Sequence, residues 1–326
     1  MKQKTYFLLR GDNEHLARGE LRALLELHSV EPRLECYTML CISSASSEVA
    51  VEVVSRAGYI KEAGVVLGVF DAYSPSDARE AGALLDHKAH VSVLKSTVSA
   101  EAVREFVERA GLVHRYGGLP ENRLVFTDGL AIAAVKLAEQ DTRGMALRAS
   151  QRPFKRSIAL TPEVARALVN LARARRGSLL LDPFAGTGTV LLEAWSMGIR
   201  GLAVDVDWEL VKGMRENFAF FKANVIPVIG DSRQLSYVEV DHVATDLPYG
   251  RGASTHGVEI RGLYKEFFEK LSEYLSKKGY ASFMAPLWLE EYVNEQLDLH
   301  GFRLVGRYYD YVHSGLTRVI SVVTRA

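Results

Sequence analysis

The chain has 326 residues, of which 48% are hydrophobic and 25% are charged, so it is long enough for two or three domains with a sizeable core. Its 40 basic and 40 acidic side chains balance, which excludes a global positive field, and any nucleic-acid partner must therefore be met by a local patch. The two cysteines, Cys36 and Cys41, exclude a wide disulfide framework, and we expect both to be small buried hydrophobes in a reducing compartment.

The amino terminus predicts neither a signal sequence nor a membrane anchor. The longest apolar run before Arg10 has only four residues, 6–9, far fewer than the roughly 20 that a membrane-spanning helix needs. We therefore expect a soluble, cytoplasmic protein without a membrane partner.

The first 149 residues predict two small α/β domains with a boundary near residue 75, judged from apolar periodicity and turn residues. In the first domain the expected strands are 6–9, 36–42 and 65–70, and the expected helices are 14–28 and 47–57. In the second domain the expected helices are 76–85 and 100–110, and residues 89–94 are strand-like. The segments 124–127, 130–137 and 145–149 complete this α/β unit.

Residues 150–326 predict a linker, a first helix and an α/β domain that begins near 177. Thr161 and the following Pro162-Glu163 predict a helix start, because a capping hydroxyl, a first-turn proline and an acid all favour one. Short apolar strands then alternate with helices, which predicts a mostly parallel, Rossmann-like sheet covered on both faces. A hairpin over 302–324 is expected to insert one antiparallel strand. The other expected strands are 178–181, 201–204, 225–229, 242–245 and 280–284, and the expected helices are 161–175, 190–197, 208–223 and 264–275.

A basic strip lies between these two parts. Residues 142–162 hold five cations and no acid, which suits either a solvated linker or a surface that contacts phosphates. In the second case the strip would make binding salt-dependent, with roughly one unit of slope per phosphate neutralised. The five cations are Arg143, Arg148, Arg152, Lys155 and Arg156.

A glycine loop follows the first strand of the Rossmann-like sheet, and acids follow the next two strands. In such sheets ligands bind outside the carboxyl ends of the strands, and glycines let the backbone approach them closely. We expect Asp205 to bind ribose hydroxyls, Asp231 the adenine amine and Asp182 the methionine ammonium of S-adenosylmethionine. The expected cofactor-binding residues are Thr161, Asp182, Phe184, Ala185, Gly186, Thr187, Gly188, Thr189, Asp205, Asp231 and Ser232.

A nicotinamide dinucleotide is the competing cofactor, because Asp205 also follows the loop at the spacing of a ribose-binding acid. However, Leu191 occupies the position where the dinucleotide fingerprint has its third glycine or alanine. A pyrophosphate would also lie close to the negative Asp182. These two features favour the methyl donor.

The tetrapeptide Asp246-Leu247-Pro248-Tyr249 follows strand 242–245 to the same edge. A lone four-residue motif of this kind can be a plain turn, but its place beside a cofactor loop favours an acceptor site. There the Asp246 carboxylate and the Leu247 carbonyl can accept both N–H bonds of an exocyclic amine and stabilise positive charge on its nitrogen. Tyr249 can stack on the base and Pro248 can stiffen the loop. The tetrapeptide resembles the (Asp/Asn/Ser)-Pro-Pro-(Tyr/Phe) signature of amino-methyltransferases, with Leu247 in place of the first proline.

With both motifs in place, the chain resembles the archaeal tRNA guanine-N2 methyltransferases that modify position 10. That family has an N-terminal ferredoxin-like part, a THUMP RNA-binding domain and a Rossmann-type methyltransferase domain. The resemblance covers most of the chain and is weakest over 76–149. It implies the domains 1–75 (ferredoxin-like), 76–149 (THUMP), 150–176 (linker and first helix) and 177–326 (methyltransferase). It is carried by residues 6–9, 16–21, 152–154, 160–162, 165–166, 170–172, 182–189 and 246–251.

The resemblance implies tRNA as the partner, S-adenosylmethionine as the cofactor, and N2-methylguanosine and N2,N2-dimethylguanosine as products. It favours RNA contact for the basic strip, and Arg251 would either hold a flanking phosphate or form a surface ion pair. The histidines are scattered without ligand spacing, so no metal site is expected. The eukaryotic relatives work with a small activating protein, and the sequence does not show whether this chain needs one.

Three other functions remain open on the sequence. The same chemistry can act on another guanine, at tRNA position 6 or in ribosomal RNA. A protein of this build can bind RNA without turnover. A DNA amino-methyltransferase fits less well, because the N-terminal domains do not suit reading a major groove.

Overall fold

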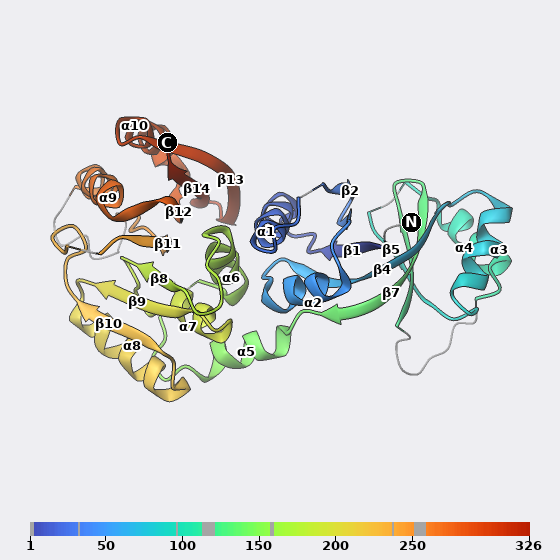
Figure 1. The fold of residues 1–326 in the computed structure, drawn as a ribbon, viewed down its shortest axis with the longest axis horizontal. Coiled ribbons are helices and arrows are strands. Elements are labelled where there is room, and N and C mark those ends of the chain that lie inside the picture. The colour runs from blue at the N-terminus through green and yellow to red at the C-terminus, as the bar shows by residue number, and fades with distance from the viewer. Residues whose placement is uncertain are drawn as a thin grey trace. The chain divides into compact units, whose positions relative to one another are not determined.

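The computed structural model describes residues 3–31, 33–95, 97–112, 121–156, 160–236, 238–250 and 259–326. It divides the chain into two compact units, Met1–Gln140 and Asp141–Ala326 (Figure 1). The division falls ten residues before the expected boundary near 150, because the helix over 142–151 packs with the second unit. A guanidinium of that helix, Arg148, pairs with Glu193 of the second unit at 3.0 Å.

The described part of the first unit contains one seven-stranded sheet in the order β2-β3-β1-β4-β7-β6-β5. Its strands are β1 (Lys4–Leu9), β2 (Glu35–Tyr37), β3 (Leu40–Ser43), β4 (Ile60–Asp71), β5 (His90–Val93), β6 (Asn122–Thr127) and β7 (Leu130–Glu139). Its helices are α1 (Glu14–Leu27), α2 (Ser47–Arg56), α3 (Pro75–Leu84) and α4 (Ala100–Arg109).

The expected boundary near residue 75 does not separate two sheets in this unit. β4 is longer than the strand expected over 65–70, and it pairs antiparallel with β1 on one side and with β7 on the other. A strand that is shared in this way joins residues 1–75 to residues 76–139 through backbone hydrogen bonds. Periodicity could locate the strands but not their partners.

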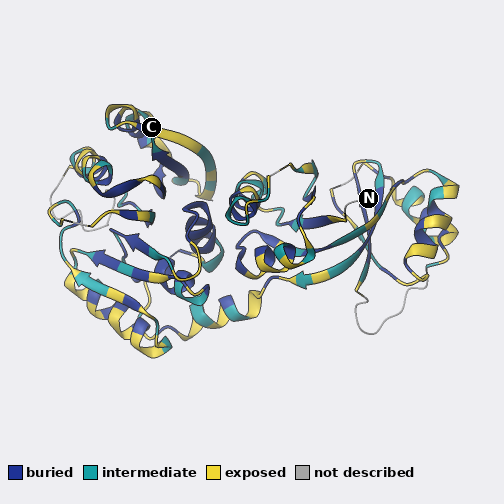
Figure 2. Cartoon of the chain, in the orientation of Figure 1, coloured by how far each residue is buried: buried dark blue, intermediate teal, exposed yellow. Residues whose placement is uncertain are grey.

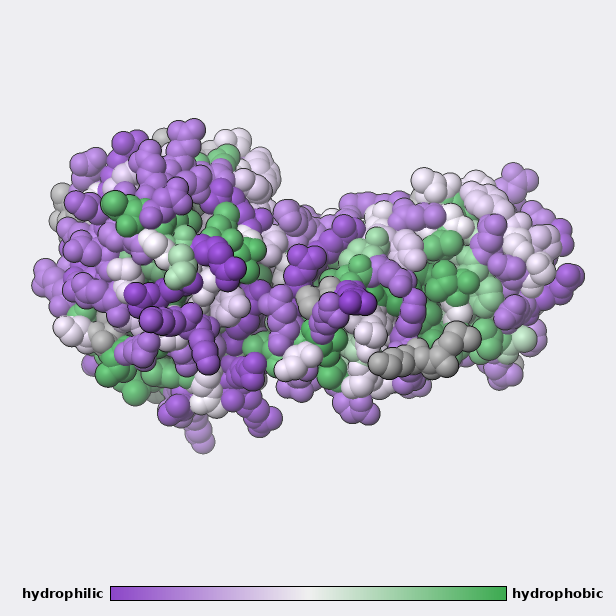
Figure 3. All heavy atoms as spheres, turned by 45° about the horizontal axis from the view of Figure 1, so that its top comes forward, coloured by the Kyte–Doolittle hydropathy of each residue, from purple (hydrophilic) through white to green (hydrophobic). Residues whose placement is uncertain are grey.

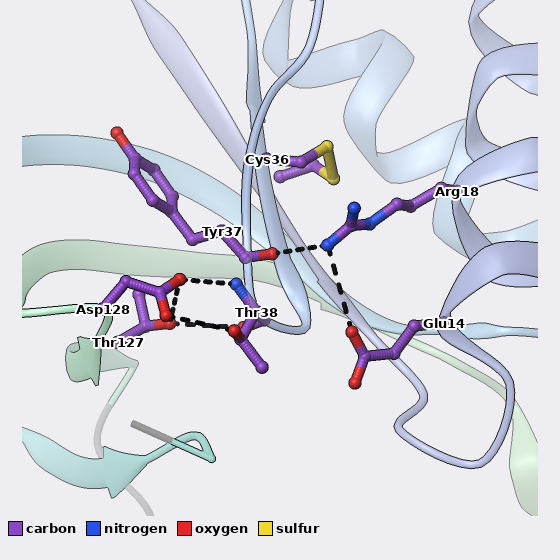
Figure 4. Close-up of a disulfide and its surroundings, with 8 residues drawn as sticks. Glu14, Arg18, Cys36, Tyr37, Thr38, Thr127 and Asp128 are labelled. Carbon is purple, nitrogen blue, oxygen red and sulfur yellow. Dashed lines mark hydrogen bonds and ion pairs between the residues drawn. A yellow bond between two sulfur atoms is a disulfide. The ribbon is translucent and has the colours of Figure 1, made fainter. Parts of the chain in front are cut away.

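The segment 36–42 is a hairpin rather than the single strand that its composition predicts. A turn at Thr38-Met39 reverses the chain, so that Cys36 and Cys41 become opposite residues of β2 and β3. The structure joins them in a disulfide (Figure 4), and the expectation of two unpaired buried cysteines is therefore wrong. The turn is held from outside: the Asp128 carboxylate accepts hydrogen bonds from the Thr38 amide at 2.7 Å and from its hydroxyl at 3.1 Å.

The described part of the second unit contains a seven-stranded sheet in the order β10-β9-β8-β11-β12-β14-β13. Its strands are β8 (Leu179–Asp182), β9 (Arg200–Asp205), β10 (Val225–Ile229), β11 (Val240–Asp246), β12 (Leu275–Pro286), β13 (Phe302–His313) and β14 (Leu316–Arg325). The helices are α5 (Thr142–Gln151), α6 (Pro162–Leu171), α7 (Thr189–Ser196), α8 (Trp208–Phe221), α9 (Ile260–Tyr274) and α10 (Glu290–Leu299), with a 3-10 turn η1 (Leu287–Leu289).

The first five strands of that order are parallel, and β14 runs antiparallel between β12 and β13. The predicted fold class is thereby confirmed: a mostly parallel Rossmann-like sheet with an antiparallel strand inserted at one end. Helix α10 was not predicted, and neither was helix α5, which contains residues 145–149.

Successive residues of β12 show which helices cover which face, because side chains alternate along a strand. The Ser282 hydroxyl donates to the carbonyl of Leu168 in α6 at 2.6 Å. The next side chain, Phe283, packs on the other face against Phe268 of α9, with ring centroids 5.3 Å apart. The central strands β8 and β11 are consequently buried along most of their length (Figure 2). No helix among the described residues combines the length and apolar character that a membrane span requires.

Candidate active site

Acidic side chains gather at the carboxyl edge of the second unit's sheet. Asp182, Asp205 and Asp246 are the last residues of the parallel strands β8, β9 and β11, and Asp231 lies just beyond β10. Parallel strands that run side by side end at the same edge. Burial raises the pKa of Asp182 to about 7, and the negative charges of Asp205 and Asp246 add to the effect. The structure thus brings three predicted cofactor residues, Asp182, Asp205 and Asp231, to the same sheet edge as the predicted acceptor residue Asp246.

The glycine loop adopts backbone conformations that favour glycine. Gly186 and Gly188 have φ of +54° and +80°, in the left-handed region where a side chain is strained. The Gly186 amide donates to Asp205 Oδ2 at 2.8 Å, which connects the loop to the neighbouring strand. A Cβ atom at Gly188 would lie 2.6 Å from the Phe218 ring, whereas a Cβ at Gly186 would meet no atom within 4 Å. The loop therefore packs tightly on α8 behind it and leaves open space at Gly186.

Asp182 is 1% exposed and orients the start of this loop. Its Oδ1 accepts hydrogen bonds from the Thr245 hydroxyl at 2.7 Å and from the Phe184 amide at 3.2 Å. Thr245 was missed in the sequence, although it is the residue before Asp246 and lies on the strand next to β8.

The remaining loop residues line the same turn. Phe184 packs its ring against Phe267 of α9, with centroids 5.8 Å apart, and Ala185 is buried. The hydroxyls of Thr187 and Thr189 lie 3.2 Å apart. Phe184, Ala185 and Thr187 belong to the turn between β8 and α7, and Thr189 is the first residue of α7.

The other predicted cofactor residues have structural partners of their own. The Thr161 hydroxyl caps α6 by accepting from the Val164 amide at 3.4 Å. Asp231 forms an ion pair with Arg233 at 2.6 Å, and Ser232 is buried beside it. A nucleobase amine that uses Asp231 must therefore share that carboxylate with Arg233, which the sequence analysis did not single out.

The acceptor tetrapeptide forms a compact turn after β11. The Tyr249 hydroxyl donates a hydrogen bond to Asp246 Oδ1, and the Tyr264 hydroxyl of α9 donates to the Pro248 carbonyl at 3.2 Å. Burial raises the pKa of Asp246 to about 6, against the lowering effect of the Tyr249 hydrogen bond. Because this pKa lies below 7, Asp246 is mostly ionised at neutral pH and can accept a hydrogen bond from an N–H group. In this structure the Tyr249 hydroxyl donates to it.

Leu247 departs from the proline of the amino-methyltransferase signature for a structural reason. Its side chain is 1% exposed in the hydrophobic core, and its amide donates to the Met284 carbonyl of β12 at 3.1 Å. A proline has no amide hydrogen to donate. Here the link to β12 stiffens the turn instead.

Two residues near the acceptor turn were missed in the sequence. Arg318 of β14 lies with its guanidinium carbon 6.0 Å from the centre of the Tyr249 ring. It also forms an ion pair with Asp310 of β13 at 3.5 Å. Both come from the C-terminal hairpin, which is far from the tetrapeptide in sequence.

The basic strip is not one continuous surface. Arg148 pairs with the buried Glu193, and Arg152, only 8% exposed, donates to the Thr189 hydroxyl at 2.5 Å. These two guanidinium groups therefore bind partners within the protein, Glu193 and Thr189. Arg143, Lys155 and Arg156 are exposed, with Lys155 bonded to the Ser150 carbonyl and Arg156 3.6 Å from Glu209. Arg251 lies outside the described residues.

Residues 152–154 cross over α8 and contact the glycine loop; we call them the strap. Asn217 of α8 is fully buried and accepts from the Phe154 amide at 2.9 Å while donating to its carbonyl at 3.0 Å. The same Asn217 amide donates to the Thr187 carbonyl at 3.1 Å. With the bond from Arg152 to Thr189, the strap has two connections to the loop that sequence reasoning did not find.

Among the described residues, no group of three or more His, Cys, Asp or Glu side chains is placed to hold a metal ion.

Comparisons with known proteins agree with this geometry. The family described as UPF0020, RMKL-like, methyltransferase domain, matches residues 149–300. The tRNA (guanine(10)-N2)-dimethyltransferase of Methanothermobacter thermautotrophicus is 37% identical over 211 residues, which are 64% of this chain and 60% of that protein. The protein of the same name from Pyrococcus abyssi is 28% identical over 98% of both chains.

Among solved structures, TrmN from Thermus thermophilus superposes with a TM-score of 0.60 at 20% identity, over 99% of this chain and 100% of that one. This likeness shows the fold. A probable tRNA (guanine(10)-N2)-dimethyltransferase from Methanothermococcus thermolithotrophicus is 34% identical over 170 residues, which are 49% of this chain and 96% of that protein. Because this chain covers nearly the whole of that relative at this identity, it belongs to the family of archaeal tRNA (guanine(10)-N2)-dimethyltransferases.

Proposed function

We propose that the chain transfers methyl groups from S-adenosylmethionine to the exocyclic N2 amine of guanine 10 in tRNA, giving N2-methylguanosine and then N2,N2-dimethylguanosine. The observation that carries the proposal is the placement of Asp246, which ends β11 at the same sheet edge as the glycine loop after β8. The names of the relatives support tRNA and guanine 10 as the substrate.

The residues at the edge fit the methyl donor. The open space at Gly186 accommodates a ligand close to the backbone, and Asp205 can bind ribose hydroxyls with the lone pairs not used by the loop. The buried carboxyl of Asp182 suits a ligand ammonium, because a positive charge there would stabilise its ionised form. Bound at this loop, the cofactor supplies an electrophilic methyl group.

The chain's own residues would prepare the amine. The Asp246 carboxylate and the Leu247 carbonyl accept its two N–H bonds, which turns the nitrogen lone pair toward the methyl carbon. As the carbon–nitrogen bond forms and the carbon–sulfur bond breaks, the negative Asp246 stabilises the charge that grows on nitrogen. The nitrogen then loses one proton, which Asp246 can accept because its pKa is about 6. Tyr249 must leave Asp246 when the base arrives, and its ring is then available for stacking.

We assign RNA binding to residues 76–149, as a THUMP domain, and to the exposed cations Arg143, Lys155 and Arg156. The target guanine has to leave its stack to reach Asp246. A protein that modifies tRNA in this way would act in the cytoplasm, and the proposal does not require an activating subunit.

The test is incubation with labelled S-adenosylmethionine and an unmodified tRNA transcript, followed by mass analysis of the nucleosides. We expect N2-methylated guanosine from the natural transcript and none from a transcript with adenine at position 10. Retained methylation of the adenine-10 transcript would reassign the target guanine.

The acceptor assignment is tested separately with Asp246→Ala, which should abolish transfer while cofactor binding persists. The matched control is Asp241→Ala, which removes an exposed carboxylate from the opposite end of the same strand and should leave transfer intact. Wild-type turnover in Asp246→Ala would contradict the assignment.

A further inference from the structure

We propose that Arg318 and Asp310 are positioning residues of the acceptor site, with Arg318 holding the Tyr249 ring beside Asp246 and keeping that carboxylate charged for the incoming amine. The inference rests on the proposed function, because it concerns the same transfer reaction. Neither residue belongs to the glycine loop or the acceptor tetrapeptide.

Strand register brings the pair to the site. In β14, Arg318 lies opposite Pro286 of β12 and opposite Asp310 of β13. Two residues before Pro286, Met284 lies opposite Asp246. Side chains that lie opposite one another point to the same face, so Arg318 and Asp310 share a face of the sheet at its carboxyl edge. The inserted antiparallel strand thus delivers a cation to a site otherwise rich in carboxylates.

The ion pair with Asp310 does not account for the burial of Arg318. The side chain is 12% exposed and stands 3.5 Å from Asp310, longer than the ~2.8 Å of a strong charge-assisted hydrogen bond. Its Nε is buried without a hydrogen-bond partner in the described part of the chain. Burying a guanidinium that Asp310 only partly satisfies is costly. The position of this charge beside Tyr249 is explained by its electrostatic interaction with Tyr249 and Asp246.

Within the described ranges, the charged and titratable groups that act on Asp246 come from five parts of the second unit. They are Tyr249 in its own turn, Arg318 on β14, Asp310 on β13, Asp182 on β8 and Tyr264 on α9. Among the effects resolved on Asp246, burial and Asp310 raise its pKa, whereas the Tyr249 hydrogen bond and Arg318 lower it. When a base displaces the Tyr249 hydroxyl, Arg318 becomes the main group that favours the ionised carboxylate.

Substituting Arg318 and substituting Asp310 should shift the pH–rate profile in opposite directions. In single-turnover assays between pH 5 and 9, Arg318→Gln should move the acid limb of the rate profile to higher pH. Arg318 lowers the pKa of Asp246. A nearby opposite charge typically lowers a carboxyl pKa by roughly one unit or more, so the rate at pH 5 should fall about tenfold further than in the wild type. Asp310→Asn removes the repelling acid and should move the limb to lower pH. Arg318→Lys keeps the charge and should restore most of the profile.

Arg307→Gln is the matched control, because Arg307 lies on the same hairpin and pairs with Glu290 instead. Carbon NMR titration of the Asp246 carboxyl gives the same readout without turnover, so it also serves a variant of reduced stability or an inactive one. Shifts of opposite sign in Arg318→Gln and Asp310→Asn support the proposal. An Asp246 titration that is unchanged in both would overturn it, even if Asp246→Ala is inactive and the proposed function stands. Absence of any transfer by the wild type would instead refute the proposed function.

Discussion

Asp182 is a carboxyl group whose ionisation links folding to ligand binding. It is buried, it accepts hydrogen bonds from Thr245 and Phe184, and its pKa is raised to about 7, mainly by burial. In the unfolded chain the pKa of an aspartate is about 4. Between these values the folded state holds a proton that the unfolded state has lost, so stability falls as pH rises from about 4 to 7. Above pH 7 the buried Asp182 carboxyl is ionised, and the free energy of unfolding is lowered by the full amount.

We expect Asp182→Asn to remove this cost. Without cofactor, the variant should unfold at a higher temperature than the wild type at pH 8, and the difference should shrink toward zero near pH 4. The same variant should bind S-adenosylmethionine more weakly, because it lacks the charge proposed to hold the ammonium. Thermal unfolding across this pH range, with and without cofactor, measures both effects. A stability difference that does not vary with pH would show that Asp182 is not the titrating group.

Single residues also show where sequence reasoning reached its limit. Asp182, Asp205 and Asp246 could be placed at one edge because each ends a recognisable apolar strand. The sequence could not explain why leucine replaces proline at position 247, because the hydrogen-bond partner of its amide, Met284, lies on a different strand. The internal partners of Arg148 and Arg152 were hidden for the same reason: a charge count does not tell which side of a segment faces the protein.

At the scale of elements, the strap connects the basic segment to the cofactor loop through Asn217. This side chain bonds both backbone groups of Phe154 and the carbonyl of Thr187. On the facing turn of α8, a Cβ at Gly213 would lie 2.2 Å from the Phe154 ring, so the ring occupies space that only glycine leaves. The strap therefore holds the glycine loop in position through residues that would not themselves contact the cofactor.

We expect Asn217→Ala to weaken cofactor binding, because it leaves the Phe154 backbone and the Thr187 carbonyl without this partner. Of these bonds, only the one to Thr187 reaches the glycine loop directly; one unpaired buried group costs about 1–3 kcal/mol, so the loss in affinity should be at least about fivefold. Gly213→Ala should act in the same direction by displacing the ring. Calorimetry with the cofactor and its demethylated product measures the effect. Wild-type affinity in both variants would show that the strap does not support the loop.

The C-terminal hairpin shows how a well-predicted element can still hide a site. Strands 302–313 and 316–324 with a turn at 314–315 were predicted and confirmed. An uninterrupted two-residue turn would have placed Asp310 opposite Val319. A register shift between Tyr311 and His313 places it opposite Arg318 instead. Bulges of this kind add a residue to one strand only, and nothing in the apolar pattern reveals them.

At the scale of the whole molecule, net charge is zero, and hydrophilic side chains dominate the face of the second unit shown in Figure 3. Binding to a polyanion must then depend on where the exposed cations lie. Of the five cations in the predicted strip, only Arg143, Lys155 and Arg156 are exposed. Replacing Arg148 or Arg152 would disturb folding as well as charge, because their partners Glu193 and Thr189 are buried.

We expect replacement of Arg143, Lys155 and Arg156 by glutamine to weaken tRNA binding and to flatten its salt dependence. Each phosphate contact contributes roughly 0.7–0.9 to the slope of log affinity against log salt, so three lost contacts should lower the slope by about 2. The matched control replaces three exposed lysines of the same unit, Lys222, Lys277 and Lys278, which lie at α8's end and β12's start, away from the carboxyl edge. Both variants lose the same charge, so a general field effect would change both slopes equally. A smaller slope in the first variant alone would locate the RNA beside the strap. Equal slopes in both variants would show that Arg143, Lys155 and Arg156 make no specific contact with RNA.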